Sequence, residues 1–363
     1  HLRFQGDVGG GYDDAAGRSA LRGIADRLAR GRGLVVVGDW PMPLLGLDCF
    51  ILRAPPGRSA DAEASALSRQ PGVAFSEPVR LFRTQGAGAR LGKSLFAAQP
   101  ATRAWRLADL HQIADGRGVR VAVIDSRVDQ THPDLLGQVA LARDFAGGGQ
   151  AVAETHGTAV AGIIAARAGN GVGILGVAPG ARLLALRACI QSVAGAGAVC
   201  DSLALAEALH FAVDHGAGVI NLSLAGPNDP LLARLLDVAL ARGATVVAAV
   251  DRQLPGGGFP ASHPGVIAVA AEAMEPVAGA VYLAPGRDVP TTLPGGRWSF
   301  VNGDSFAAAH VSGLFALLRE RSTRARTAAA LAPAGGGRID ACASLLRAGG
   351  PCDCACARPA APS

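Results

Sequence analysis

The chain has 363 residues and half of them are hydrophobic, enough to bury a sizeable core in one large domain and a small one. Its formal net charge of +5 comes almost entirely from arginine, and no basic patch interleaved with aromatic residues suggests a nucleic-acid surface. No uninterrupted apolar run reaches the roughly 18 residues of a membrane-spanning helix, so a membrane span is not expected.

The first part of the chain has the pattern of a small α+β unit. Helical spacing covers Ala20–Arg30, and a second helix is expected from Ser59, a capping serine, to Gln70. Three runs are typical of strands: Leu34–Val37, Leu47–Leu52 and Gly72–Pro78. We expect this domain to cover residues 1–83 and an exposed, glycine-containing linker to cover residues 84–100, where proteolytic cuts are expected.

From residue 101, apolar strands alternate with amphipathic helices, which predicts a doubly wound, mostly parallel sheet with helices on both faces. The expected strands are Val119–Ile124, Arg182–Leu186, Val219–Leu222, Thr245–Val250 and Val266–Ala270. The expected helices are His156–Arg167, Asp201–His215, Pro230–Arg242 and Ser305–Leu318. This large domain covers residues 101–346, and a cysteine-rich tail covers residues 347–363.

Cysteine usage bears on the cellular compartment. Cys189 and Cys200 bracket a glycine- and alanine-rich loop, and a bridge between them would stabilise the fold by roughly 2–3 kcal/mol. The other late cysteines are Cys342, Cys352, Cys354 and Cys356. The last three have one-residue spacings unlike a zinc site, and no histidine follows them, so disulfides are favoured over a metal. Disulfides indicate a secreted or periplasmic protein, whose export signal is expected to be missing from this sequence.

Three polar residues stand where strands and helices meet. Asp125 directly follows a buried strand, and His156 and Ser305 each begin a helix. At a helix start, unpaired backbone N–H groups and the positive dipole end can hold an oxyanion, and a serine nucleophile needs a histidine base oriented by a carboxylate. An N-capping serine or a structural histidine is the ordinary interpretation of each residue alone. Together they predict a catalytic Asp-His-Ser set at one edge of the sheet.

The order and surroundings of these residues resemble the subtilisin-like serine peptidases. The resemblance is carried by Val123-Ile124-Asp125-Ser126, His156-Gly157-Thr158 and Gly303-Asp304-Ser305-Phe306-Ala307-Ala308, and it covers about residues 101–346. It implies a secreted endopeptidase in which Ser305 attacks the peptide carbonyl, His156 transfers the proton and Asp125 orients the imidazole. It implies extended polypeptides as substrates.

The small N-terminal domain resembles the propeptides of this family, which assist folding and inhibit the enzyme by laying a C-terminal tail along the cleft. The resemblance implies a self-processing precursor, cut between about residues 84 and 104, whose own propeptide is a partner. An ordinary accessory domain is the alternative. Cys49 would leave with the propeptide, and the six remaining cysteines could then pair completely.

Two further segments resemble substrate-binding elements of the family. The first is the edge where an extended peptide adds as a strand, and it consists of Ser223, Leu224, Ala225 and Gly226. Alanine stands at position 225 where glycine is usual. The second would form one wall of an apolar pocket for the residue before the cut, and it consists of Ala248, Ala249 and Val250.

Two positions near the nucleophile depart from the family pattern. Arg252 stands where an asparagine usually donates to the oxyanion, and Asp304 replaces a threonine or serine. Loss of that asparagine slows a subtilisin roughly 100- to 1000-fold. Arg252 either donates in its place or pairs with Asp251 and points to solvent, which would leave a slow enzyme. Asp304 is expected to favour the charged form of His156. A pseudoprotease that only binds extended peptides is the alternative function.

This chemistry requires no cofactor. Structural calcium is common in the family, but spacing does not locate a site in this sequence. The available carboxylates are Asp129, Asp134 and Asp144.

Overall fold

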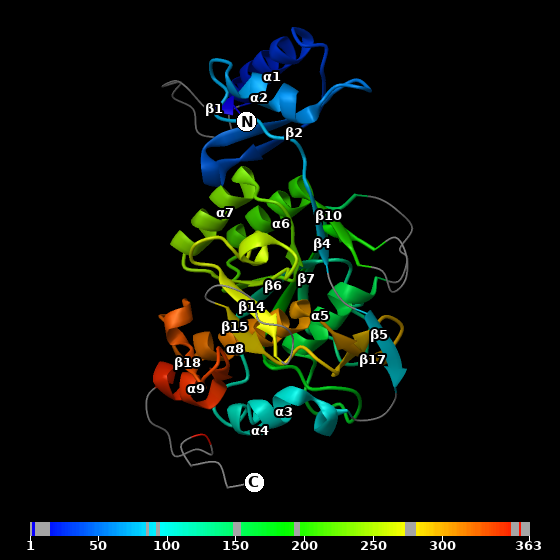
Figure 1. Ribbon diagram of the computed structural model, residues 1–363, viewed down its shortest axis with the longest axis vertical. Helices are drawn as coiled ribbons and strands as arrows, with labels where there is room; N and C mark the ends of the chain where they lie inside the picture. Colours follow the sequence, from blue (N-terminus) through cyan, green and yellow to red (C-terminus); the bar gives the residue numbers. More distant parts are fainter. Residues whose placement is uncertain are drawn as a thin grey trace. The chain divides into compact units, whose positions relative to one another are not determined.

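The computed structural model describes residues 2–3, 15–84, 87–91, 95–147, 154–191, 197–272, 281–349 and 356 (Figure 1). The chain divides into two compact units after Val79, not after residue 83 as predicted. The boundary lies earlier because β4 (Leu81–Thr84) is a strand of a sheet in the larger unit.

The small unit is an α+β domain. It contains α1 (Ala15–Arg30), α2 (Ala60–Ser68) and an antiparallel sheet in the order β1 (Leu2–Arg3), β3 (Leu47–Arg53), β2 (Val35–Met42). Ser59 caps α2 by accepting a hydrogen bond from the N–H of Ala62. The strand predicted at Gly72–Pro78 is wrong, because the N–H and carbonyl of Ser76 bond to the Ser68 hydroxyl instead of to a neighbouring strand.

The large unit is built on a seven-stranded parallel sheet, which confirms the predicted fold class. The strands, in spatial order, are β15 (Tyr282–Ala284), β14 (Ile267–Ala271), β13 (Thr245–Ala249), β11 (Val219–Leu222), β6 (Arg120–Asp125), β8 (Arg182–Arg187) and β7 (Val139–Asp144). The two edge strands were not predicted: β15 has only 3 residues, and most side chains of β7 are exposed, so neither forms an apolar run.

Four main helices cover this sheet: α5 (Thr155–Ala165), α6 (Ser202–Asp214), α7 (Pro230–Ala241) and α8 (Asp304–Arg321). Figure 1 shows α6 and α7 on one side of the sheet and α5 and α8 on the other. Almost all of α8 is buried, from Asp304 to Leu318, so this helix is the centre of the core. Among the described residues, no helix combines the length and apolar character needed to cross a membrane.

Smaller sheets lie around this core. One has the order β12 (Leu224–Ala225), β4, β10 (Val199–Asp201), β9 (Cys189–Ile190), and another has the order β16 (Val289–Leu293), β17 (Arg297–Asn302), β5 (Ala87–Leu91). The short β18 (Ala332–Pro333) and β19 (Ile339–Asp340) form a pair. The remaining helices are α3 (Pro100–Ala104), α4 (Leu107–Leu110), α9 (Ala341–Gly349) and the 3₁₀ turns Pro43–Leu45, Phe96–Ala98, Pro255–Gly257 and Ala328–Ala330.

The segment predicted as an exposed linker, residues 84–100, belongs to the large unit. Thr84 is only 5% exposed, and β5 pairs with β17. Gln99 is buried and donates from its side chain to the Leu175 carbonyl over 2.7 Å. The glycine content of this segment misled the prediction, because pairing with a distant strand leaves no mark in local composition.

Among the described residues, two disulfides tie the large unit together. Cys189 and Cys200 face each other across β9 and β10 and are bonded, as proposed from the sequence. Cys342 of α9 bonds to Cys356, and α9 continues past residue 346, so the described part of the predicted tail is joined to the large unit. Cys49 is a buried thiol of the small unit. Cys352 and Cys354 lie outside the described residues.

Helix α5 approaches the turn after β6 so closely that only glycine fits at position 157. A Cβ added there would lie 2.2 Å from the carbonyl oxygen of Ser126. The N–H of Gly157 donates to the Ser126 hydroxyl over 2.9 Å, so the contact is also a hydrogen bond. This contact fixes the start of α5 against the end of β6.

We expect Gly157→Ala to destabilise the protein by about 1–3 kcal/mol, because backbone on both sides must shift to admit the methyl group. The matched control is Gly23→Ala in α1, where the added Cβ meets only the end of the Arg27 side chain at 3.6 Å. Alanine is the better helix former, so the control should be neutral or slightly stabilising. Denaturant unfolding of both variants, each made in the full-length Ser305→Ala chain so that residues 1–85 are retained, tests this, and a Gly157→Ala protein as stable as the control would contradict it.

Candidate active site

Asp125 and His156 form a buried pair at the carboxyl edge of the sheet. Asp125 ends β6 and is fully buried, and His156 is the second residue of α5 and is 5% exposed. Nδ1 of His156 lies 2.8 Å from Oδ1 and 3.0 Å from Oδ2 of Asp125. Because a carboxylate only accepts, Nδ1 carries the proton in the neutral ring, and Nε2 then has the lone pair that a base requires.

Ser305 lies at the start of α8. It is the second residue of this helix, and the residue before the helix is Gly303, whose φ of 149° lies in a region that favours glycine. The Ser305 hydroxyl donates to the Ser223 carbonyl over 3.0 Å, and the Ser223 hydroxyl donates back to the Ser305 carbonyl over 2.9 Å. The next residue, Phe306, packs against the His156 ring with 5.5 Å between centroids. The structure therefore places Asp125 in hydrogen-bond contact with His156, and it places Phe306, the neighbour of Ser305, against the same imidazole.

The side chain of Arg252 forms a bidentate ion pair with Asp304. Nε lies 3.0 Å from Oδ2 and Nη2 lies 2.8 Å from Oδ1, and Nη2 also donates to the Ala271 carbonyl over 3.2 Å. The Asp304 side chain is 1% exposed and the Arg252 side chain is 19% exposed. The N–H of Ala271 supplies a further donor to Asp304 over 2.7 Å.

This ion pair corrects one expectation and removes the premise of another, which stays untested. The proposed pairing of Arg252 with Asp251 is wrong, because the Asp251 carboxylate accepts from the N–H of Gln253 over 2.8 Å and the guanidinium turns to Asp304. The expected effect of Asp304 on His156 presupposed an uncompensated negative charge. Asp304 is instead compensated by Arg252 directly beside the nucleophile.

The predicted substrate-binding edge carries a strand of the chain itself. In β12, Leu224 pairs with Thr84 and Ala225 pairs with Arg83 of β4, in antiparallel register. The opposite edge of β4 pairs with β10, with Phe82 opposite Cys200. Gly226 exchanges backbone hydrogen bonds of 2.8 and 3.1 Å with Phe259. Thus β4 lies between two strands, one of which contains residues predicted to bind peptide.

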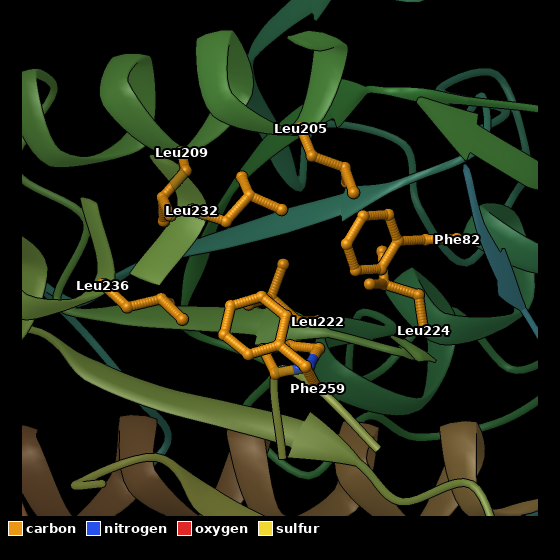
Figure 2. A pocket seen from close by; sticks show the side chains of 9 residues that line it. Phe82, Leu205, Leu209, Leu222, Leu224, Leu232, Leu236 and Phe259 are labelled. Carbon is orange, nitrogen blue, oxygen red and sulfur yellow. The ribbon is translucent and has the colours of Figure 1, made fainter. Parts of the chain in front are cut away.

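The Phe82 side chain is fully buried and is one of the residues that line an apolar pocket (Figure 2). Its ring centroid is 6.3 Å from that of Phe259. A Cβ on Gly226 would lie 2.4 Å from the Phe82 ring, so glycine at this position makes room for the phenyl group. The other lining residues come mainly from α6, α7 and β12: Leu205, Leu209, Leu222, Leu224, Leu232, Leu236 and Pro260.

Sequence reasoning missed this pocket. Its signal was present in the leucines of α6 and α7, to which the sequence analysis gave no role. Ala248, Ala249 and Val250 are buried at the end of β13 and do not line the pocket of Figure 2. Their predicted contact with the residue before the cut stays a prediction.

His310 in α8 illustrates a histidine with a structural role. It is 1% exposed, and Nδ1 lies 2.8 Å from the Phe306 carbonyl. Burial lowers the pKa of His310 to about 4, against the opposing effect of its hydrogen bonds to backbone carbonyls. The ring is therefore neutral at ordinary pH and packs edge-on against Trp105.

The three carboxylates considered for calcium are held by protein donors. Asp129 accepts from Thr131 and from the N–H of Gly295, and these bonds outweigh burial, so that the pKa of Asp129 is lower than usual. The other contacts are Asp134 with Asn170, Ile174 and Trp298, and Asp144 with Arg127 and Arg187. The described ranges contain no cluster of three potential metal-ligating side chains. Calcium binding stays a prediction.

Comparison with known proteins finds a matching family and similar sequences. The model of the Subtilase family matches residues 116–332. The thermophilic serine proteinase of Bacillus sp. strain AK1 is 36% identical over 276 residues, covering 72% of this chain and 66% of that protein. Subtilisin E of Bacillus subtilis strain 168 is 34% identical over 275 residues, covering 69% of this chain and 66% of that protein. The matched part of this chain thus spans 66% of the length of each relative.

A solved structure shows the same fold. The crystal structure of fervidolysin from Fervidobacterium pennivorans, a keratinolytic enzyme related to subtilisin, matches 90% of this chain and 59% of its own chain, with a TM-score of 0.71 and 24% identity. Together with the family match over residues 116–332, these similarities establish that the chain belongs to the subtilase family of subtilisin-like serine peptidases.

Proposed function

We propose that this protein is a secreted serine endopeptidase that cleaves extended polypeptides through Asp125, His156 and Ser305. The observation that carries the proposal is the buried bond of 2.8 Å between Asp125 and Nδ1 of His156, formed beside the start of the helix that holds Ser305. The two intramolecular disulfides support secretion.

The proposed reaction has two halves. The Ser305 hydroxyl leaves the Ser223 carbonyl, turns to Nε2 of His156 and attacks the peptide carbonyl, and His156 takes the proton. The imidazolium, stabilised by Asp125, then protonates the leaving amine, so the C–N bond breaks and an acyl-enzyme remains. Water, activated by His156, hydrolyses that ester. The N–H of Ser305 at the start of α8 donates to the oxyanion in both halves.

Incubation with casein and with a fluorophosphonate probe tests this function. The probe phosphonylates only an activated serine, so we expect stoichiometric labelling of Ser305 together with casein cleavage, and loss of both in Ser305→Ala. Labelling without dependence on Ser305, or peptide binding with neither labelling nor cleavage, would contradict the proposal. The second outcome would identify a pseudoprotease.

We further propose that the chain is a precursor that cuts itself just after β4. Thr84, the last residue of β4, pairs with Leu224, whose neighbour Ser223 accepts the hydrogen bond of the Ser305 hydroxyl. On the other side, Ala87 pairs with Asn302, which precedes the start of α8. The candidate cut therefore falls between Gln85 and Gly86, two residues outside the described part. Residues 1–85 would then be the propeptide.

N-terminal sequencing of the purified protein should give Gly86, and Ser305→Ala should remain uncut. Phe82→Ala should slow the cut about 10- to 100-fold, because a buried phenylalanine contributes roughly 1.5–3 kcal/mol to seating the strand. Leu81→Ala is the matched control, since Leu81 is 59% exposed on the same strand. A cut outside residues 84–87, or equal rates for the two variants, would refute this precursor model.

We propose that Arg252 and Asp304 act as a single unit and make the enzyme slow. Asp304 engages both Nε and Nη2 of Arg252, which holds the guanidinium against the helix start instead of leaving it to follow the oxyanion. Each residue compensates the charge of the other at a buried position. Removing either one is therefore expected to destabilise the fold, because the remaining charge is left without its partner.

A double-mutant cycle tests this coupling. Arg252→Asn alone leaves the Asp304 charge buried without its partner, and we expect a loss of about 3–5 kcal/mol of stability. The double variant Arg252→Asn with Asp304→Thr should recover most of that stability and, because the amide donor is restored, should raise kcat about 100-fold over the natural chain. A double variant slower than the natural chain would show instead that Arg252 is the oxyanion donor.

A further inference from the structure

We infer that a cavity at the carboxyl edge of the main sheet binds a small, doubly charged oxyanion such as phosphate or sulfate. The cavity has a volume of about 200 Å³ and lies where the neighbouring strands β6, β8 and β7 end. A cavity must offer roughly 10–15 Å³ to hold one water molecule, so this one has room for an ion of several atoms. The inference does not depend on the proposed endopeptidase activity.

Arginine side chains from the ends of three strands line the cavity. Arg127 follows β6, Arg187 ends β8, and Arg143 is the last residue but one of β7. The other polar residues of the lining are Gln130 and Asp144, so three guanidinium groups face one carboxylate. The planar fork of N–H donors in arginine matches the oxygens of a phosphate or sulfate ion. The lining therefore has the charge and the donors of an oxyanion site.

Two of these arginines have donors that no protein group uses. Arg143 is exposed, and no ion pair joins it to a carboxylate in the part of the chain that the structure describes. The Arg127 guanidinium donates from Nη2 to Asp144 over 3.2 Å, and its buried Nε has no hydrogen-bond partner among the described residues. The Arg127 side chain is 43% exposed, so it can turn these donors towards an ion in the cavity.

Asp144 shows how the lining holds a negatively charged group. Its carboxylate oxygens lie 3.2 Å from Nη2 of Arg127 and 2.9 and 3.1 Å from Nη1 of Arg187. The side chain is 42% exposed and belongs to the edge strand β7, so rotation about its Cα–Cβ bond can carry the carboxylate into solvent. An oxyanion in its place can accept from the same two arginines and from Arg143 as well.

Arg187 can bind the ion without releasing the start of α5. Its Nε donates to Glu154 over 2.9 Å and its Nη2 bonds to the same carboxylate, whereas Nη1 faces Asp144. Glu154 also accepts from the backbone N–H of Arg127. Once Asp144 has turned away, the three arginines and Glu154 leave two positive charges. A doubly charged oxyanion balances both, and a single carboxylate balances only one, so the count favours phosphate or sulfate.

Calorimetric titration with inorganic phosphate tests the inference directly. The protein is the full-length Ser305→Ala chain, so the result holds whether or not the enzyme proposal does. Chloride keeps the ionic strength constant, so that the general screening of charge does not change. We expect saturable binding at one site, with a dissociation constant of about 1 mM or below. Binding that does not saturate would overturn the inference, because weak uptake by a basic surface involves no defined site.

Two substitutions in the lining should shift the affinity for phosphate in opposite directions. Arg143→Ala removes a charged donor and should weaken binding about 10-fold. Asp144→Asn keeps the size of the side chain but removes the competing carboxylate, so it should strengthen binding about 10-fold. The matched control is Arg103→Ala, at an exposed arginine of α3, which should leave the affinity unchanged. Equal affinities for all three variants would overturn the inference.

Chemical protection supplies a second readout that requires no substitution in the cavity. Phenylglyoxal modifies accessible arginine side chains, and mass spectrometry measures the rate at each residue. Phosphate at ten times its dissociation constant should slow the modification of Arg127 and Arg143 about 10-fold, because only the unbound protein reacts. Arg103 should react at the same rate throughout. Equal rates at Arg143 in phosphate and in chloride would contradict the inference, even where the enzyme proposal holds.

Discussion

The hydrogen bond between Asp125 and His156 is the interaction on which the rest of the site depends. It joins the end of a central strand to the start of a helix, and it can form only because Gly157 lets α5 touch the turn at Ser126. A second buried contact holds the same helix start: Glu154, the residue before α5, pairs with Arg187 of β8 over 2.9 Å. The imidazole is thus oriented by elements of the sheet as well as by its carboxylate.

The start of α8 completes the site and carries its main peculiarity. A helix start favours negative charge, and Asp304 exploits this with the N–H of Ala271 and the guanidinium of Arg252 as donors. Arg252 and Asp304 would each weaken an oxyanion site on its own. Together they form an ion pair without net charge. Ser305 therefore lies next to an ion pair without net charge. The proposed loss of the oxyanion donor lowers turnover more than it lowers the stability of the fold.

Two strands of the chain itself pair with the site in the way proposed for a substrate. Phe82 is buried among the apolar residues that line a pocket, β4 adds to β12, and β5 adds to β17, so the same backbone pairing operates before and after the candidate cut. These contacts explain why the large unit begins at Arg80 and why residues 87–91 are a strand. Both features follow from extended chain adding to existing strand edges.

The sequence predicted the fold class, because buried parallel strands are continuous apolar runs, and it predicted Asp125 beside His156, because ligand sites gather at the carboxyl edge of such a sheet. It did not predict β7, whose exposed side chains lack such a run. Of the two roles left open for Arg252, the pairing with Asp251 is wrong. Asp251 is adjacent in sequence, whereas Asp304 is brought near only by the packing of α8 on the sheet, and local sequence does not encode that distance.

The central claim is that Asp125, His156 and Ser305 act as one unit, and the rate at which a fluorophosphonate labels Asp125→Asn tests it most directly. The account predicts a fall of about 1000-fold or more, because the asparagine no longer holds the imidazole in the useful tautomer. Asp237→Asn, at a side chain 70% exposed, should label at the natural rate. A folded Asp125→Asn protein labelled as fast as this control would contradict the account.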